Sequence, residues 1–115
     1  MYIDYDFPNW NKYIEAERSN KYWASNMKKE EKEIVKLLCR NMKPVEKYPV
    51  TIVATKYVKN RNTDVDNIRI KGLLDGLVSA GILQNDNLKC IKKVILQAEV
   101  SNTRTGIDID IIEDE

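Results

Sequence analysis

The sequence predicts an α+β fold, a two-layer sandwich with the element order β-α-β-α-β-β, in which helices pack on one face of a mixed or antiparallel sheet. Three patterns support this prediction. Residues 50–58 form a β-branched apolar run, which is typical of a central strand. The segment from about Ser25 repeats apolar residues with the helical period. Residues 107–111 alternate isoleucine with aspartate, as a half-buried strand does.

The N-terminal part of the chain contributes the first strand and the first helices. Along residues 1–7, more polar and more apolar side chains alternate loosely, which predicts a short strand. Asn9 then caps a short helical turn. A longer helix is predicted to begin near Ser25 and to end at Pro44, with the charged run 28–33 on its solvent face. Its apolar stripe consists of Met27, Ile34, Val35, Leu38 and Met42.

Another helix follows the central strand. Asp64 or Asp66 is its expected cap, and Gly81 is the expected residue after its C-terminus. Gly72 and Gly76 lie four residues apart inside it, and each lowers helix propensity by about 1 kcal/mol relative to alanine. Something should therefore approach closely at these glycines, namely the sheet, a partner subunit or a substrate backbone. The apolar face of this helix consists of Ile70, Leu73, Leu74, Leu77 and Val78.

Two further strands complete the predicted fold. Residues 88–100 are expected to form one strand, residues 101–106 a hairpin loop and residues 105–112 the second strand. The chain then ends in an acidic tail of about residues 108–115.

Length and composition limit the classes of function. The 115 residues are predicted to form one domain, residues 1–115, and a composition of 43% hydrophobic and 32% charged residues is ordinary for a soluble globular protein. We expect a cytoplasmic protein without a membrane partner, since no signal peptide or bilayer-spanning run is evident. The absence of histidine excludes His-based zinc sites and Ser-His-Asp triads. Cys39 and Cys90 are expected to be buried free thiols.

The positive charge is unevenly distributed, although the net charge is only +1. Basic residues flank the segment 62–87 on both sides, while the C-terminal tail is acidic. This distribution suits contact with a phosphate backbone, and the alternative is an ordinary solvated surface. The candidate DNA contacts are Lys59, Arg61, Lys89, Lys92 and Lys93, with Arg104 as a further one.

One short segment carries the candidate chemistry. Asp64 and Asp66 lie two residues apart in a turn, and Asp86 from a later turn can complete an all-oxygen cage. Such a cage suits Mg²⁺ or Mn²⁺, which would activate a water and neutralise charge on a phosphodiester. Lys71 could place a positive charge near a substrate oxygen, with Asp75 as a further acid. Alternatively, the two aspartates are helix caps, and Lys71 and Asp75 form a surface ion pair.

A family resemblance rests on the run Asp64-Val65-Asp66-Asn67, then Lys71, Asp75-Gly76-Leu77 and Asn85-Asp86. This pattern resembles the RusA family of Holliday junction resolvases, phage and prophage enzymes with a D-x-D-N motif, a helical lysine, a D-[AG]-L motif and a D-D turn. The start Pro8-Asn9-Trp10 is similar to the family's proline-rich, asparagine-containing start. The resemblance spans most of the chain, and residues 59–88 are its specific part.

The resemblance implies a homodimeric, Mg²⁺-dependent crossover junction endodeoxyribonuclease that resolves branched DNA by paired symmetric nicks. It also implies that Asp64, Asp66 and Asp86 are metal-binding catalytic residues and that Lys71 is the essential lysine. The interval from Asp66 to Lys71 is one residue longer than in the best-known member of the family. Arg69 or Ile70 could therefore occupy the place of the lysine.

Two alternatives come from other classes of protein. Asn85 stands where the family has a second acid, which favours a branched-DNA-binding protein of the same fold without catalysis. If the aspartates are only caps, the chain is a non-enzymatic phage interaction module. Trp10, Tyr13 and Trp23 could stack on unpaired bases, or belong to the core as aromatic residues at helical spacing usually do.

Overall fold

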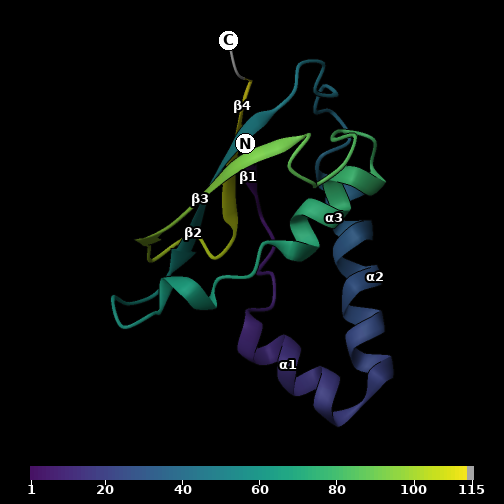
Figure 1. Cartoon of the computed structure of the whole chain (residues 1–115). Coiled ribbons are helices and arrows are strands. Elements are labelled where there is room, and N and C mark those ends of the chain that lie inside the picture. Colours follow the sequence, from purple (N-terminus) through teal and green to yellow (C-terminus); the bar gives the residue numbers. More distant parts are fainter. Residues whose placement is uncertain (114–115) are drawn as a thin grey trace.

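The computed structural model describes residues 1–113, and Asp114 and Glu115 of the predicted acidic tail lie outside the described residues. The described chain forms an α+β fold in two layers, as the sequence predicts (Figure 1). Its elements are β1 (Tyr2–Ile3), α1 (Trp10–Ser19), α2 (Lys21–Leu38), β2 (Val50–Val58), the 3-10 helix η1 (Val65–Asn67), α3 (Lys71–Ser79), β3 (Ile91–Val100) and β4 (Ile107–Glu113). Within residues 1–113, every helix is too short or too polar to cross a bilayer.

The sheet is mixed and has the strand order β1-β4-β2-β3. β2 is an inner strand, as predicted, and it pairs in parallel with β3 and antiparallel with β4. The predicted hairpin between the last two strands is wrong, because β2 lies between them. Burial explains the arrangement, because Ile107 and Ile109 of β4 are buried and need neighbours on both sides. β3 is largely exposed and therefore suits an edge.

Asparagine side chains begin both N-terminal helices. Asn9 Oδ1 accepts a hydrogen bond from the backbone N–H of Lys12 at 2.9 Å, which confirms the predicted cap, although α1 is much longer than one turn. Asn20 Oδ1 accepts from the backbone N–H of Tyr22 at 2.8 Å. α2 therefore begins before the predicted Ser25, because the cap satisfies a backbone donor that would otherwise lack a partner.

The C-terminal end of α2 lies at Leu38, before the predicted Pro44. The backbone N–H of Cys39 closes the helix by donating to the carbonyl of Val35 at 2.8 Å. Cys39 and Cys90 are buried free thiols, as expected, and burial raises the pKa of the Cys39 thiol. The hydrophobic setting thus keeps this thiol protonated and unreactive.

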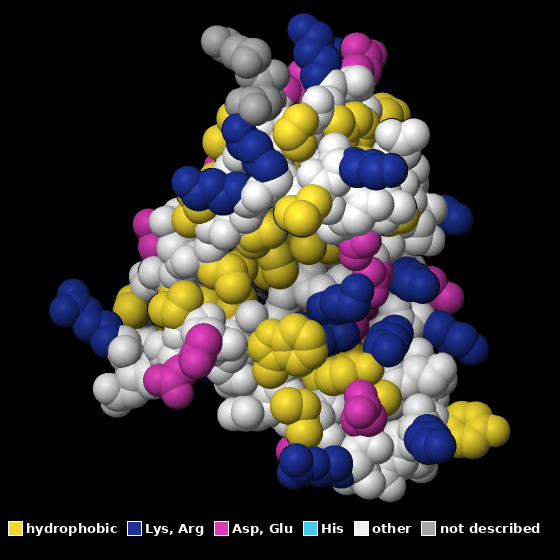
Figure 2. Space-filling model, viewed as in Figure 1, with side chains coloured by type: hydrophobic (Ala, Val, Ile, Leu, Met, Phe, Trp, Pro, Cys, Tyr) yellow, Lys and Arg dark blue, Asp and Glu magenta, His cyan; other side chains and the backbone are white. Residues whose placement is uncertain are grey.

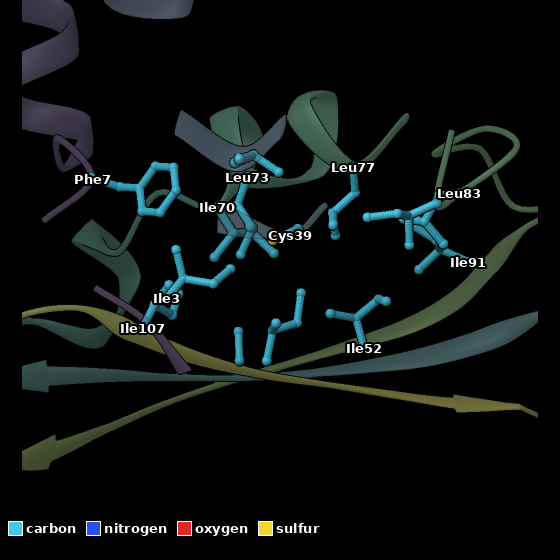
Figure 3. Close-up of a cluster of buried hydrophobic side chains, with 14 of the residues drawn as sticks. Ile3, Phe7, Cys39, Ile52, Ile70, Leu73, Leu77, Leu83, Ile91 and Ile107 are labelled. Carbon is cyan, nitrogen blue, oxygen red and sulfur yellow. The ribbon is translucent and has the colours of Figure 1, made fainter. Parts of the chain in front are cut away.

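The hydrophobic core lies between the sheet and the two helices α2 and α3 (Figures 1 and 3). Val50, Ile52 and Ala54 alternate along β2 toward the helices and are buried together with Leu73 and Leu77 of α3. Each buried leucine or isoleucine contributes about 1.5–3 kcal/mol relative to an exposed one. The periodicities that predicted β2 and α3 therefore mark the residues that hold the two layers together.

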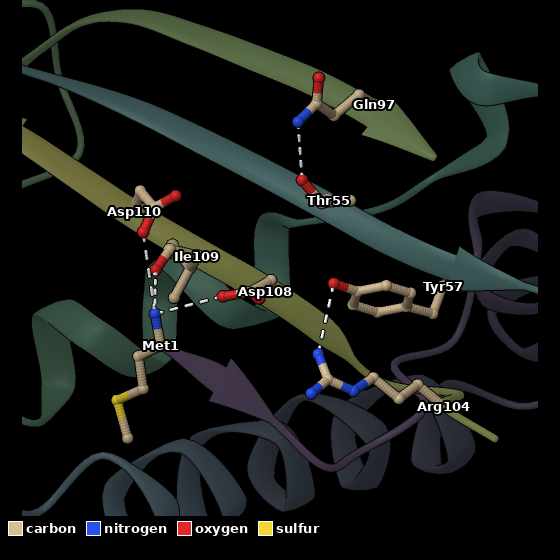
Figure 4. Close-up of polar contacts among 8 residues, drawn as sticks. All are labelled: Met1, Thr55, Tyr57, Gln97, Arg104, Asp108, Ile109 and Asp110. Carbon is tan, nitrogen blue, oxygen red and sulfur yellow. Dashed lines mark hydrogen bonds and ion pairs between the residues drawn. The ribbon is translucent and has the colours of Figure 1, made fainter. Parts of the chain in front are cut away.

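The opposite face of β2 makes polar contacts (Figure 4). Gln97 Nε2 donates a hydrogen bond to Thr55 Oγ1 at 2.8 Å, which links β3 to β2. Arg104 Nη1 donates to Tyr57 Oη at 3.4 Å, and its guanidinium lies 4.7 Å from the centre of the Tyr2 ring. Arg104, one of the candidate DNA contacts, is thus held against this face of the sheet.

Two glycines allow α2 and α3 to approach closely. A Cβ at Gly72 would overlap the carboxylate of Glu31, and a Cβ at Gly76 would lie 2.6 Å from Val35 Cβ. A close neighbour is present, as expected, but it is α2 and not the sheet, a partner subunit or a substrate backbone. Glu31 is completely buried, so the prediction that the run 28–33 lies on the solvent face is wrong at this position.

We expect Gly76→Ala to lower the free energy of unfolding by about 1–3 kcal/mol, although alanine is the better helix former. The crowded neighbour is the branched side chain of Val35, which cannot swing away without moving α2. Urea unfolding followed by circular dichroism measures the effect. Val35→Ala removes two of the three atoms that crowd position 76, so the substitution should be less damaging in that background. An equal loss in both backgrounds would contradict the close helix contact.

Tyr5 links the N-terminal segment to α2, because its Oη donates to Glu30 Oε1 at 3.1 Å. Burial, followed by this hydrogen bond and the charge of Glu30, raises the pKa of Tyr5 to about 12. The folded protein holds the phenol proton more tightly than the unfolded chain, so stability is present below about pH 10 and is lost as the pH rises toward about 12. We expect Tyr5→Phe to lose less stability than the wild type between about pH 10 and about pH 12 in urea unfolding. If both proteins lost the same stability, the phenol of Tyr5 would have the same pKa in the folded and the unfolded state.

Candidate functional site

The D-x-D-N segment forms a turn of its own before α3. Asp64 precedes the 3-10 helix η1, and its side chain makes no cap hydrogen bond. α3 begins only at Lys71, with Ile70 in the cap position and no side-chain cap. The prediction that Asp64 or Asp66 caps this helix is therefore wrong. Lys71 is the first residue of α3.

The turn presents two carboxylates to solvent. Asp64 and Asp66 are both exposed, and within residues 1–113 neither carboxylate has a hydrogen bond or an ion pair. The turn itself is fixed, since Ile68 is buried in the core and Asn67 Oδ1 accepts a hydrogen bond from the backbone N–H of Asn11 at 3.1 Å. The asparagine of the motif thus ties the turn to the start of α1 and leaves the aspartates available for a ligand.

Asp64 borders a cavity of about 140 Å³ between the N-terminal segment, β2 and η1. Lys56 lies in its wall with only 15% of its side chain exposed, and its Nζ lies 2.7 Å from Asp6 Oδ1. Lys56 also donates to the carbonyl of Thr105. The cavity is lined by Asp6, Phe7, Asn9, Lys12, Lys56, Val58, Thr63, Asp64, Asn67, Ile68, Arg69 and Ile107. One motif aspartate therefore shares a small cavity with two lysines.

Sequence reasoning did not assign Lys12, Lys56 or Asp6 to a site. A signal for Lys56 was available: it follows Ile52 and Ala54 on the side of β2 that faces the helices, where an apolar residue is expected. Asp6 gave no comparable signal, because it lies 50 residues from its partner Lys56.

A second cluster lies at the start of α3. Lys71 Nζ is 3.2 Å from Asp75 Oδ1, as the predicted surface pair requires, and 3.7 Å from Asp86 Oδ2. The turn that contains Asp86 thus folds back to the first residue of the helix. The side chains of Lys71 and Asp75 remain partly exposed, so their pairing adds at most about 1 kcal/mol to stability.

The candidate DNA-contacting residues lie in two places. Lys89, Lys92 and Lys93 line an open depression of about 690 Å³ together with Asp86. Lys59 is exposed in the loop after β2, and Arg61 lines a separate depression in that region. Basic side chains therefore accompany both acidic turns, as the distribution of charge along the sequence predicts.

The donor set fits a hard cation by its chemistry, since carboxylate oxygens are the ligands that Mg²⁺ prefers. Asp64 and Asp86 nevertheless line different depressions. Over residues 1–113, no group of three or more Asp, Glu, His or Cys side chains is arranged to hold a metal ion. The three predicted ligands are thus present and exposed, and the structure does not bring all of them together.

Arg69 is fixed in the interior beside the turn. Its Nη1 lies 2.6 Å from Glu31 Oε2, and both side chains are almost completely buried. The guanidinium also lies 4.4 Å from the centre of the Tyr13 ring and 5.6 Å from that of Trp10. Ile70 is buried in the core. Arg69 and Ile70 are therefore both engaged in the fold, and neither is available to take the place of Lys71.

Comparison of the chain with models of protein families, with curated proteins and with solved structures found no match.

Proposed function

We propose that the protein is a RusA-like, Mg²⁺-dependent endodeoxyribonuclease that cuts four-way or otherwise branched DNA. The observation that carries the proposal is the pair Asp64 and Asp66, two exposed carboxylates on a fixed turn that neither cap a helix nor pair with another described side chain. By the same resemblance, we place the protein in the bacterial cytoplasm, with a phage or prophage origin.

Asp64 and Asp66 are the residues that would hold the metal ion, with Asp86 as the third acid. A bound Mg²⁺ supplies charge neutralisation at the phosphodiester and a lowered pKa for water. Lys56 and Lys12 line the cavity next to Asp64, where their ammonium groups can attract a phosphate. Lys71 would do the same near Asp86. Metal binding would have to draw the Asp86 turn and the Asp64 turn closer together.

Phosphate contacts away from the reacting bond come from the basic side chains around both turns. Lys89, Lys92 and Lys93 line one depression, and Lys59 and Arg61 lie on the loop that leads to Asp64. Such contacts position the DNA without reading its sequence. Recognition would therefore depend on the shape of the branched DNA and on salt concentration.

A junction with two equivalent strands calls for two active sites, so the proposal includes a homodimer. β3 is an edge strand, and the hydrophobic side chains Val94 and Val100 on it are exposed, as is Leu88 just before it. Figure 2 shows hydrophobic side chains gathered along this part of the surface. A second copy of the chain is the occupant that fits, because its own apolar edge is the matching surface.

We expect light scattering during size-exclusion chromatography to give twice the chain mass of 13.4 kDa for the wild type. Val94→Glu should shift the mass toward a single chain, because it would place a charge in the apolar contact. Ile112→Glu is the matched control, since Ile112 is also exposed but belongs to the inner strand β4. A dimer that tolerates Val94→Glu and is lost in Ile112→Glu would place the contact elsewhere.

The test of function is cleavage of a labelled synthetic four-way junction and of a linear duplex of matched sequence, with and without Mg²⁺ or Mn²⁺. Paired symmetric nicks in the junction that require the metal are the expected result. Neither binding nor cleavage of any DNA would exclude the proposal and favour a non-enzymatic interaction module.

One specific observation favours a second function, a branched-DNA-binding protein without catalysis. Asp86 pairs with Lys71 and lines a different depression from Asp64, and its neighbour Asn85 carries no charge. This alternative predicts tight binding of the junction and intact strands in every divalent ion.

A further inference from the structure

The corner between α1 and α2, residues 17–29, presents two aromatic rings to solvent. The two helices meet there, at the end of the molecule away from the sheet (Figure 1). Tyr22 and Trp23, in the first turn of α2, are 77% and 61% exposed. Within residues 1–113, neither ring has an aromatic or cation–π partner. Rings left in water this way add nothing to the core, so a partner is the better explanation for them.

The charge of the corner indicates which partner fits. Residues 17–29 contain one acid, Glu17, and four basic residues, all exposed in the structure. The basic residues are Arg18, Lys21, Lys28 and Lys29. Hydrophobic and basic side chains lie next to one another at this end of the molecule in Figure 2. Aromatic rings among basic groups are the combination that binds unstacked bases together with their phosphates.

The corner is also connected rigidly to the candidate site. Asn9, the cap of α1, lines the cavity beside Asp64, and the backbone N–H of Asn11 donates to Asn67 of the acidic turn. From there α1 runs ten residues to the corner, a distance of about 15 Å at the helical rise of 1.5 Å per residue. That length corresponds to about four base pairs of duplex DNA. A DNA branch at the acidic turn can therefore also reach the corner.

We propose that the α1–α2 corner is a second DNA contact, in which Trp23 or Tyr22 stacks on an exposed base at the branch while the basic side chains hold the flanking phosphates. This inference rests on the proposed function, because it takes branched DNA as the substrate. An interfacial membrane helix would need a continuous apolar face. The exposed residues on either side of the two rings in the sequence are instead polar, namely Asn20, Lys21, Ser25 and Asn26.

The chain offers a direct probe, since Trp10 and Trp23 are its two tryptophans. In Trp10→Phe, the emission reports on Trp23 alone, and in Trp23→Phe it reports on Trp10 alone. In EDTA, which prevents cleavage, a synthetic four-way junction should quench the emission of Trp10→Phe more strongly than a matched linear duplex does. Trp23→Phe should respond weakly, because Trp10 packs against Arg69.

Binding measurements on a labelled junction give an independent readout. Trp23→Ala combined with Tyr22→Ala should weaken junction binding about tenfold or more, and alanine is a good helix residue, so α2 should persist. Arg18→Ala and Lys21→Ala should each make the binding constant less dependent on salt. The slope of its logarithm against the logarithm of salt concentration should fall by the amount expected for about one phosphate contact. Leu37→Ala and Lys36→Ala, exposed positions at the other end of α2, are the matched controls and should bind like the wild type.

The outcomes separate this inference from the proposed function. If the wild type binds the junction while Trp23 emission and the affinity of the alanine variant stay unchanged, the corner is not a DNA contact and the nuclease proposal stands. If the wild type binds no DNA at all, both proposals fail. A response of Trp23 to phosphatidylserine vesicles with none to DNA would overturn the inference in favour of a membrane surface.

Discussion

Arg69→Met is expected to lower the free energy of unfolding by about 3–5 kcal/mol, because it leaves the carboxylate of Glu31 buried without its cation. The two side chains are 1% and 0% exposed and meet at 2.6 Å between α2 and the start of α3. Glu31 Oε1 and Arg69 Nε and Nη2 have no hydrogen-bond partner among the described residues. The single ion pair and the Tyr13 and Trp10 rings therefore compensate for the lost hydration of both charges.

The matched control for this prediction is Lys71→Met, which removes an exposed ion pair and should change stability by less than about 1 kcal/mol. The double variant Glu31→Met with Arg69→Met should recover much of the loss, since two apolar side chains of similar volume replace the pair. Urea unfolding followed by circular dichroism gives all of these free energies. If Arg69→Met were no less stable than Lys71→Met, water would have to reach the pair of Glu31 and Arg69.

Asp66→Asn and Asp64→Asn are each expected to slow junction cleavage at least about a hundredfold, because each removes a charged ligand from the site that would hold the metal. Binding of the junction should be retained, since the loss of a negative charge near phosphate does not oppose association. Folding should also be unaffected, because neither carboxylate has a structural partner among the described residues. Single-turnover cleavage measures the rate, and fluorescence anisotropy in EDTA measures the binding.

Glu46→Gln is the matched control for the aspartate variants, an exposed acid on the loop before β2 that should leave cleavage unchanged. If Asp66→Asn cut the junction as fast as the wild type, the exposed turn would have no role in catalysis. A wild type that binds but never cuts would instead support the catalytically inactive relative.

Local periodicity was enough to predict the elements that pack the core. The β-branched run gave β2 with both of its bounds, and Gly81 ends α3 with a positive φ of 79°, as expected of a residue after a helix C-terminus. The pairing of the last two strands could not be predicted in the same way. The short loop between β3 and β4 favours a hairpin. The burial that β4 gains by lying between β1 and β2 outweighs that local preference.

The contacts of the candidate site were likewise predictable only where they are local in the sequence. The four-residue spacing of Lys71 and Asp75 predicted their contact, because neighbours on a helix surface are set by local geometry. The cavity beside Asp64 depends on residues from separate parts of the chain, such as Asp6 and Lys56, and spacing carries no information about them. Glu31 was misplaced for the same reason, since its partner Arg69 lies 38 residues away.

β4, the last strand of the described chain, fills the place between the first strand and β2. On the ribosome, the nascent chain therefore emerges with both long helices and β2 made but with a gap in its sheet. Until residues 107–113 follow, Ala54 lacks its neighbour Ile109, and the backbone groups along that edge of β2 have no partner. Such an edge invites pairing with other nascent chains, so the unfinished protein should depend on chaperones until residues 107–113 have emerged.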